Sequence, residues 1–212
     1  MFIEYAQRDP FFFFSWILII VFSICFHEYA HAWMALRKGD DTAARLGHLS
    51  LNPLIQMGWV SLIMLAMIGI AWGSVPVNVS RMRGRSAHAQ VALAGPVANL
   101  ALCAIFGMVA GLGQLLNLTE EIQRFLMMAA MANGVLFLFN MIPLPMFDGW
   151  TVLSYFIEPM QRVDLRMASG YSWMALIVIW TTGIMDGIWK VGAVMGRSFQ
   201  SIILAIAGIF GA

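Results

Sequence analysis

Charged residues are scarce in this chain of 212 residues. They make up 11% of it, whereas 61% of the residues are hydrophobic, and an ordinary soluble domain carries about 25% charge. The apolar residues occur in runs of about 17 to 25, which is the length of a membrane-spanning helix. The composition therefore argues against a soluble domain and predicts an all-α polytopic membrane protein in a lipid bilayer.

Cysteine and net charge are also low. The two cysteines, Cys25 and Cys103, both lie in apolar runs, which is typical of small core residues rather than of a disulfide or a cysteine metal site. The net charge is +1 and no basic face indicates nucleic acid binding. No basic segment precedes the first apolar run, which also carries polar residues of its own, so we do not interpret it as a cleaved signal peptide.

The order of the apolar runs predicts one membrane-embedded domain over residues 1–212, with a core at 11–158 and C-terminal helices at 170–212. We expect a bundle of about five to six transmembrane helices, because no polar stretch is long enough to form a second domain. The apolar runs lie at 11–36, 54–72, 87–116, 122–142, 171–185 and 190–210.

The run at 54–72 is ambiguous. It contains Gln56 and two glycines, so it is either a full span or a re-entrant loop that returns to the side it left. Pro76 excludes a helix interior at 75–79. Of the two alternatives we expect the re-entrant loop, followed by a short extended hairpin near the polar motif of the first run.

That motif is H-E-Y-A-H at residues 27–31. On a helix His27 and His31 lie on one face, so both can bind one metal ion, and Glu28 can reach a water beside it. This is the H-E-x-x-H pattern of zinc peptidases. The pattern is short, but a charged side chain deep in a bilayer costs at least about 2.5 kcal/mol, which favours a functional role.

A catalytic zinc usually has three protein ligands and one open position, so a third ligand is needed. We favour Asp148, because two prolines break the helix before it, and broken backbone at membrane depth is tolerated only where it is buried or lines a cavity. Gly149 allows close approach of the backbone. The candidates in apolar surroundings are His48, His88, Asp148 and Asp186.

The distribution of basic residues also supports Asp148 as the third ligand. Positive residues near span ends favour the cytoplasm, which places Arg37 and Lys38 inside. If the run at 54–72 is re-entrant, the arginine cluster at 81–85 is also cytoplasmic. The next two spans then return Asp148 to the cytoplasmic half, whereas a full span would put it at the outer face, far from His31.

At these positions the sequence resembles the site-2 protease family of intramembrane zinc metalloproteases, in its short bacterial branch without PDZ or CBS domains. The resemblance covers about residues 22 to 150, and its motifs occur in family order. One departure lies at 56–59, where Q-M-G-W stands in place of a His and an Asp-Pro pair. The matching motifs are H-E-Y-A-H-A at 27–32, G-H-L-S-L-N-P at 47–53, A-G-P-V-A-N at 94–99 and N-M-I-P-L-P-M-F-D-G at 140–149.

The resemblance implies that His27, His31 and Asp148 bind one zinc ion and that Glu28 is the catalytic base. It further implies that Asn99 and Asn140 help to hold substrate backbone or a developing oxyanion. The expected substrate is a membrane protein cleaved within or near a transmembrane helix. The expected location is the cell (inner) membrane, with several spans and an active site toward the cytoplasmic side.

Two other functions remain open at this point. Paired histidines on a membrane helix also occur in haem-binding electron carriers, although these need an axial pair from facing helices and have no use for Glu28. A pseudoprotease that binds membrane helices without cutting them is the second alternative, and an intact Glu28 argues against it. Among the site residues, Asp148 can also be a helix N-cap, and Asn99 and Asn140 can be interhelical hydrogen bonders.

Overall fold

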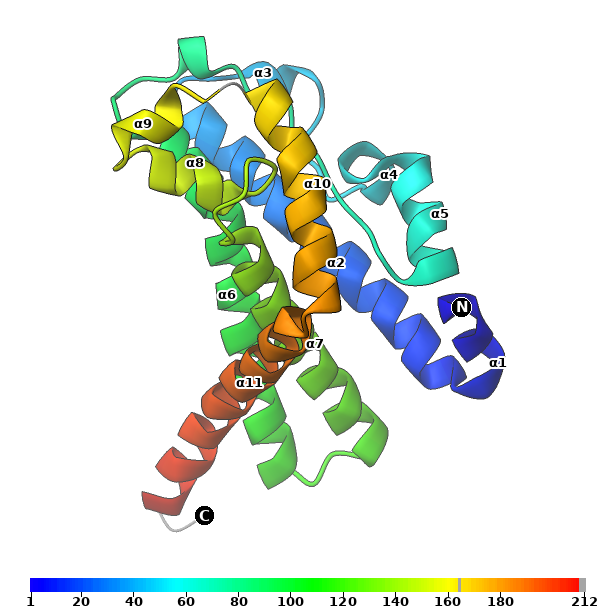
Figure 1. Cartoon of the computed structure of the whole chain (residues 1–212). Helices are drawn as coiled ribbons and strands as arrows, with labels where there is room; N and C mark the ends of the chain where they lie inside the picture. The colour runs from blue at the N-terminus through cyan, green and yellow to red at the C-terminus, as the bar shows by residue number, and fades with distance from the viewer. Residues whose placement is uncertain (164, 210–212) are drawn as a thin grey trace. The chain divides into compact units, whose positions relative to one another are not determined.

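The computed structural model describes residues 1–163 and 165–209, and its regular structure in those ranges is entirely helical (Figure 1). Two short helices, η1 (Phe2–Glu4) and α1 (Tyr5–Arg8), precede the first long one. The expected all-α polytopic fold is confirmed. The remaining elements are α2 (Pro10–Arg37), α3 (Thr42–Arg45), α4 (Pro53–Gln56), α5 (Gly58–Ile68), η2 (Val79–Arg81), α6 (Ala87–Leu115), α7 (Glu120–Asn140), α8 (Asp148–Ser154), α9 (Glu158–Gln161), α10 (Leu165–Thr181) and α11 (Ile184–Ile209).

Within the described ranges, four helices are long and apolar enough to cross a membrane: α2, α6, α7 and α11. This is fewer than the five to six that the apolar runs predict. The difference arises because α5 has 11 residues, too few for a bilayer core of about 30 Å, and α10 has 17, which is at the lower limit for a span. Residue 210, the last of the run at 190–210, lies outside the described residues.

Helix α2 begins and ends close to the predicted residues 11–36. Its N-cap, Asp9, accepts a hydrogen bond from the backbone N–H of Phe12 at 3.0 Å, and Pro10 occupies the first helical position, where its missing N–H is not needed. The helix has 28 residues and is about 42 Å long. It therefore exceeds the thickness of the bilayer core.

Residues 53–78 do not form a full span. Helix α5 is about 16 Å long and ends at Gly69, whose φ of +81° is a left-handed conformation that glycine adopts without strain. The indole N–H of Trp16 donates to the carbonyl of Gly69 at 3.2 Å and ties this turn to α2. No β-strand forms in the part of the chain that the structure describes, and residues 70–78 run as one non-helical segment.

The chain forms two compact units, Met1–Ala98 and Asn99–Ala212, and the boundary falls inside the continuous helix α6. In the second unit α7 packs against α11 through glycines. A β-carbon at Gly134 would lie 3.1 Å from the backbone of Gly192, and one at Gly192 would lie 2.7 Å from the side chain of Val135. Small residues let membrane helices approach closely, which gives van der Waals packing in the absence of a hydrophobic driving force.

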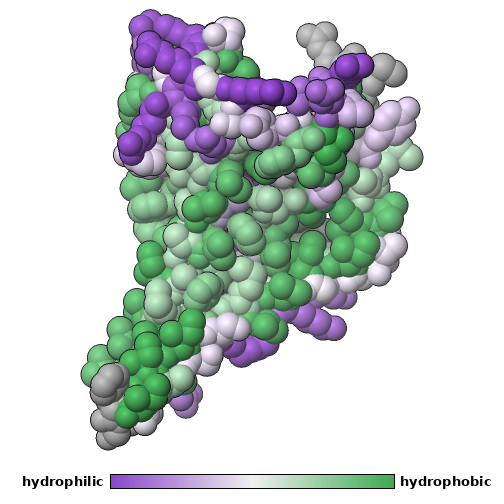
Figure 2. Space-filling model, turned by 90° about the vertical axis from the view of Figure 1, so that its left-hand side faces the viewer, coloured by the Kyte–Doolittle hydropathy of each residue, from purple (hydrophilic) through white to green (hydrophobic). Residues whose placement is uncertain are grey.

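Many large apolar side chains are exposed, as expected for a surface that faces lipid. Phe14 and Leu18 on α2 and Trp173 and Trp180 on α10 each expose more than half of their surface. The face drawn in Figure 2 is largely hydrophobic. The polar side chains that are buried are few, and several of them lie together around the H-E-x-x-H motif.

Candidate metal centre

Helix α2 brings the two histidines of the motif together. The Nε2 atoms of His27 and His31 lie 2.9 Å apart, and the ring planes meet at 82°. Two nitrogens that bind one tetrahedral zinc at about 2.0–2.1 Å are about 3.3 Å apart, so this pair fits a shared ion after a shift of a few tenths of an ångström. Both side chains are buried, with exposures of 6% and 8%.

A backbone carbonyl orients the second histidine. The Nδ1 atom of His31 lies 2.7 Å from the carbonyl oxygen of Val91 on α6. Because a carbonyl only accepts, Nδ1 carries the proton and donates it, which leaves the lone pair on Nε2, the atom that faces His27. Such hydrogen bonds fix the tautomer and the ring orientation of metal-binding histidines.

Gly95 lies against the edges of both imidazole rings, and its lack of a side chain leaves space there. A β-carbon at this position would overlap Nε2 of His31 and would lie 2.6 Å from Nε2 of His27. No other amino acid fits there without moving a ring. Pro96 follows in the helix interior, where its ring removes a backbone N–H. Gly95 therefore lies directly against the two histidines of the candidate metal centre, which the H-E-x-x-H motif alone did not indicate.

Glu28 lies beside the non-helical segment at 70–78. Its side chain is 7% exposed, and a β-carbon at Gly73 would lie 2.5 Å from its Cγ and Oε1 atoms. The hydroxyl of Ser61 binds both backbone groups of Trp72, donating to the carbonyl at 2.7 Å and accepting from the N–H at 2.8 Å. The backbone of this segment is thus held against the carboxylate.

Asp148 is the first residue of α8, and the N-cap of that helix is Phe147. The interpretation of Asp148 as an N-cap is therefore not supported. Gly149 is required where it stands, because a β-carbon there would overlap the carbonyl of Met141. The turn between α7 and α8 closes with a hydrogen bond from Phe147 N to the carbonyl of Leu144 at 2.9 Å. The two prolines thus lie in the short turn between the end of α7 and the start of α8, which has the carboxylate in its first turn.

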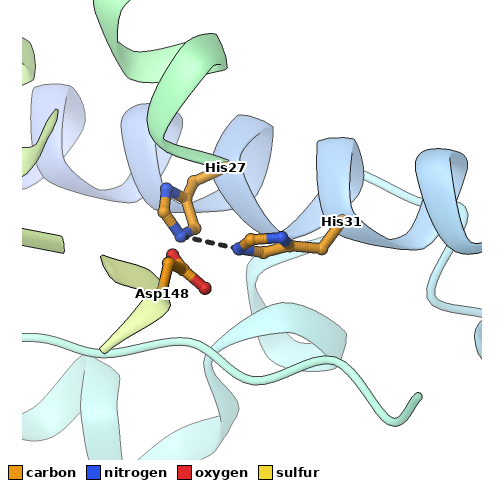
Figure 3. Close-up of side chains that lie close together, drawn as sticks. All are labelled: His27, His31 and Asp148. Carbon is orange, nitrogen blue, oxygen red and sulfur yellow. Dashed lines mark hydrogen bonds between the residues drawn. The ribbon is translucent and has the colours of Figure 1, made fainter. Parts of the chain in front are cut away.

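One group of potential metal ligands is found among the described residues, and it consists of His27, His31 and Asp148. One ligand atom from each lies within 4.8 Å of the others. Figure 3 shows the two rings and the carboxylate directed toward one another. Two imidazoles and one carboxylate form a donor set that suits a catalytic zinc.

The other candidate ligands are not part of this group. His48 lies in the loop before α4, with Nδ1 3.4 Å from Oε1 of Gln56. His88 lies in the first turn of α6, and Asp186 lies in the first turn of α11.

The two asparagines of the prediction make interhelical or local hydrogen bonds. Asn99 is fully buried and donates from Nδ2 to Oδ1 of Asn133 at 3.0 Å. Asn133 in turn donates to the carbonyl of Ala129 on its own helix. Asn140, the last residue of α7, donates to the carbonyl of Leu136 at 2.9 Å. A role of Asn99 and Asn140 toward substrate stays a prediction. Asn133 was missed, although an amide in an apolar run is a signal.

Comparison with known proteins identifies zinc metalloproteases as relatives of this chain. The chain matches Peptidase family M50 over residues 15–181. A Bacillus subtilis (strain 168) protein named "Putative zinc metalloprotease YwhC" is 30% identical over 203 residues, covering 92% of this chain and 91% of that protein. "Putative zinc metalloprotease Rip2" of Mycolicibacterium smegmatis is 31% identical over 189 residues, covering 80% of this chain and 69% of that protein. No solved structure matches the chain.

The family match begins before the H-E-x-x-H motif and extends beyond Asp148, so it includes all three potential ligands. The relatives carry names of zinc metalloproteases. With the matched range covering most of the chain, the chain belongs to peptidase family M50, the site-2 protease family of zinc metalloproteases.

Proposed function

We propose that this protein is an intramembrane zinc metalloendopeptidase that hydrolyses a peptide bond within or near a transmembrane helix of another membrane protein. The observation that carries the proposal is the convergence of His27, His31 and Asp148 within 4.8 Å, with Glu28 adjacent in the sequence. We assign these three residues as the ligands of one zinc ion per chain. The space beside Gly95 supports this assignment, because it is kept open where the ring nitrogens point.

Glu28 is the general base of the proposed reaction. When bound, zinc acts as a Lewis acid that lowers the pKa of water and polarises a carbonyl. The Glu28 carboxylate takes the proton of the attacking water and returns it to the leaving amine. Asn140 and Asn99 are our candidates for holding the substrate backbone or the developing oxyanion, and the hydrogen bond of Asn140 to its own helix can be exchanged for one to substrate.

The segment at 70–78 is suited to bind the substrate as an added strand. Its backbone is anchored at Trp72 by Ser61 and at Ser74, whose N–H donates to the carbonyl of Gln56 at 3.0 Å. In an extended chain alternate residues point to opposite sides, so Val75 and Val77 present their backbone groups to the other side. Across the described ranges, neither of these two residues makes a backbone hydrogen bond.

A substrate helix must unwind before its peptide bond can be cut, because its carbonyls are already hydrogen-bonded. An unwound strand can recover hydrogen bonds by pairing with the free edge of residues 75–77. Gly73, which precedes this edge in the chain, lies against the side chain of Glu28. We therefore propose that the scissile bond is presented in an extended conformation next to the general base.

We further propose a multi-pass location in the cell (inner) membrane, with the site toward the cytoplasmic side. The basic residues that follow α2 and those at 81–85 support this orientation, and the short α5 supports a re-entrant path between them. Fusing a reporter after Gly73 tests the topology, since a reporter that signals an outer location would contradict it.

The catalytic test uses protein in liposomes with a model substrate that has one leucine-rich span, a central Asn-Gly pair and a tag at each end. Wild-type protein should cut it, and Glu28→Gln should not, while both retain zinc by elemental analysis. Asp148→Ala should lose zinc as well as activity. Full cleavage by Glu28→Gln, or a normal zinc content in Asp148→Ala, would contradict the proposal.

A further inference from the structure

The turn after the metal-binding helix contains a buried acid outside the motif. Asp40 lies three residues beyond the end of α2 and has no exposed surface. An isolated buried carboxylate is strongly disfavoured, so the hydrogen bonds that it accepts explain its presence. Its Oδ1 accepts from the backbone N–H of Thr42 at 3.0 Å and from the Thr42 hydroxyl at 2.5 Å.

The second carboxylate oxygen binds a distant part of the chain. Oδ2 of Asp40 accepts from the backbone N–H of Asn78 at 2.6 Å. Asn78 is the last residue of the segment at 70–78 and the N-cap of η2, where its side chain accepts from the backbone N–H of Ser80. Figure 1 shows the segment leaving α5 and returning to the turn beside α3. The short distance and the negative charge mark this as a strong hydrogen bond.

Two neighbouring contacts join the same pieces of chain. The backbone N–H of Arg83 donates to the carbonyl of Lys38 at 2.7 Å. Asp41 forms ion pairs with Arg45 at 2.6 Å and with Arg81 at 3.1 Å, but these side chains are partly exposed. Exposed ion pairs contribute little, so the buried Asp40 is the stronger link to the segment.

The opposite end of the segment is held by hydrogen bonds of Ser61 to Trp72 and of Gln56 to Ser74. Gly73 lies between these two bonded residues and against the side chain of Glu28. The link from Asp40 to Asn78 therefore determines how far the segment extends along α2. A change of one residue in its register would turn the free edge at 75–77 away, because alternate residues face opposite sides.

We propose that Asp40 is a positioning residue that sets the register of residues 70–78 and so selects which peptide bond of an extended substrate lies opposite Glu28. This inference rests on the proposed function. Asp40 does not touch substrate or metal in this role, and it acts through Asn78. Its loss should therefore change where the substrate is cut, not only how fast.

Asp40→Asn is the most informative substitution. A carboxylate offers acceptors to both Thr42 and Asn78, whereas an amide offers one acceptor and places N–H donors against the other partner. The matched control is Asp41→Asn. It makes the same change of charge and shape at the adjacent residue but leaves the buried contacts of Asp40 in place. Thr42→Val removes the hydroxyl donor on the other oxygen and leaves the bond to Asn78.

Two measurements separate positioning from folding. Hydrogen exchange of the zinc-loaded protein, followed by mass spectrometry, should show the peptide over residues 74–80 exchanging about tenfold faster or more in Asp40→Asn, as expected for loss of a hydrogen bond to a charged group. Peptides from 27–37 should be unchanged. Mass spectrometry of the cleaved model substrate should show additional cut sites in this variant and the wild-type site in both controls.

The exchange measurement does not depend on catalysis, so it tests the link even if the model substrate is not cut. Unchanged exchange at 74–80 would overturn the proposal. So would a single, wild-type cut site in Asp40→Asn, or loss of zinc together with faster exchange throughout α2. An inactive wild-type protein with faster exchange at 74–80 in Asp40→Asn would instead contradict the proposed function and leave the positioning of the segment supported.

Discussion

Gly95 and His31 are so close that a β-carbon on the glycine would overlap Nε2 of the imidazole. The same nitrogen faces His27 at 2.9 Å, and the other nitrogen of the ring is held by Val91. One turn of α6 therefore both orients this ring of the proposed metal centre and leaves free the edge of the ring that faces His27. The first prediction follows from this relationship.

Gly95→Ala should weaken zinc binding about 10- to 100-fold, the range typical of changes to groups that orient metal ligands. Helix propensity alone would favour alanine by about 1 kcal/mol, so destabilisation of the zinc form would have a local steric cause. The measurement is zinc affinity by competition with a chelator. Gly187→Ala, in a helix where nothing lies near the added carbon, is the control and should bind zinc normally. Equal zinc affinity in the two variants would contradict the close approach.

Gly73→Ala should separate catalysis from metal binding. The added carbon would lie 2.5 Å from Glu28, so either the carboxylate or the segment at 70–78 must move. A displacement of about 1 Å at a reacting group can lower the rate about 100-fold. We therefore expect kcat/KM for the model substrate to fall by about that factor while the zinc content stays at the wild-type level. A variant that loses zinc would show that Gly73 supports the ligands and not the base.

The H-E-x-x-H helix was largely predictable from the sequence, and the reason is local. The spacing of His27 and His31 is itself a helical signal, and the apolar run around them fixes the helix to within a residue at each end. The proposed role of Asp148 as a metal ligand was also predictable, because the prolines and glycine beside it are local signs of a broken helix. Both inferences needed only neighbouring residues.

The roles of Gly95, Gly73 and Asn133 were not predictable in the same way. Each depends on a partner far along the chain: the rings on α2 for Gly95, Glu28 for Gly73 and Asn99 for Asn133. No local pattern indicates the role of Asp40, since its partner Asn78 lies 38 residues away. A sequence pattern reports periodicity and caps, but it does not report which turn of one helix meets another.

The hydrogen bond between Asn99 and Asn133 in the second unit leads to a third prediction. Hydrogen bonds between membrane helices contribute on average about 0.6 kcal/mol and at most about 1.7 kcal/mol. Asn99→Ala and Asn133→Ala should each lower the free energy of unfolding by an amount of this order, and the double variant should lose less than the sum because both remove the same bond. Unfolding in mixed micelles measures all three. Fully additive losses would contradict the bond as the main role of the pair.

The hydrogen bonds to Asp40 also predict how its contribution depends on pH. Burial acts to raise the pKa of this carboxyl, but the Thr42 hydroxyl, the backbone N–H groups of Asn78 and Thr42, and the charge of Arg81 together hold its pKa below the ordinary value. A group with a lowered folded-state pKa stabilises the fold at pH values above its unfolded pKa, which is about 3.9 for aspartate. This stabilisation is lost as the pH falls through the lower, folded-state pKa.

The difference in melting temperature between wild type and Asp40→Asn should therefore be constant from pH 8 to about pH 5 and should shrink below about pH 4. Both proteins are stripped of metal beforehand, so that loss of metal at low pH does not contribute to the difference. Asp41→Asn is measured in parallel to account for the neighbouring carboxylate. A difference that changes between pH 8 and pH 6 would contradict the prediction, because a carboxyl whose pKa is lowered keeps its charge over that whole range.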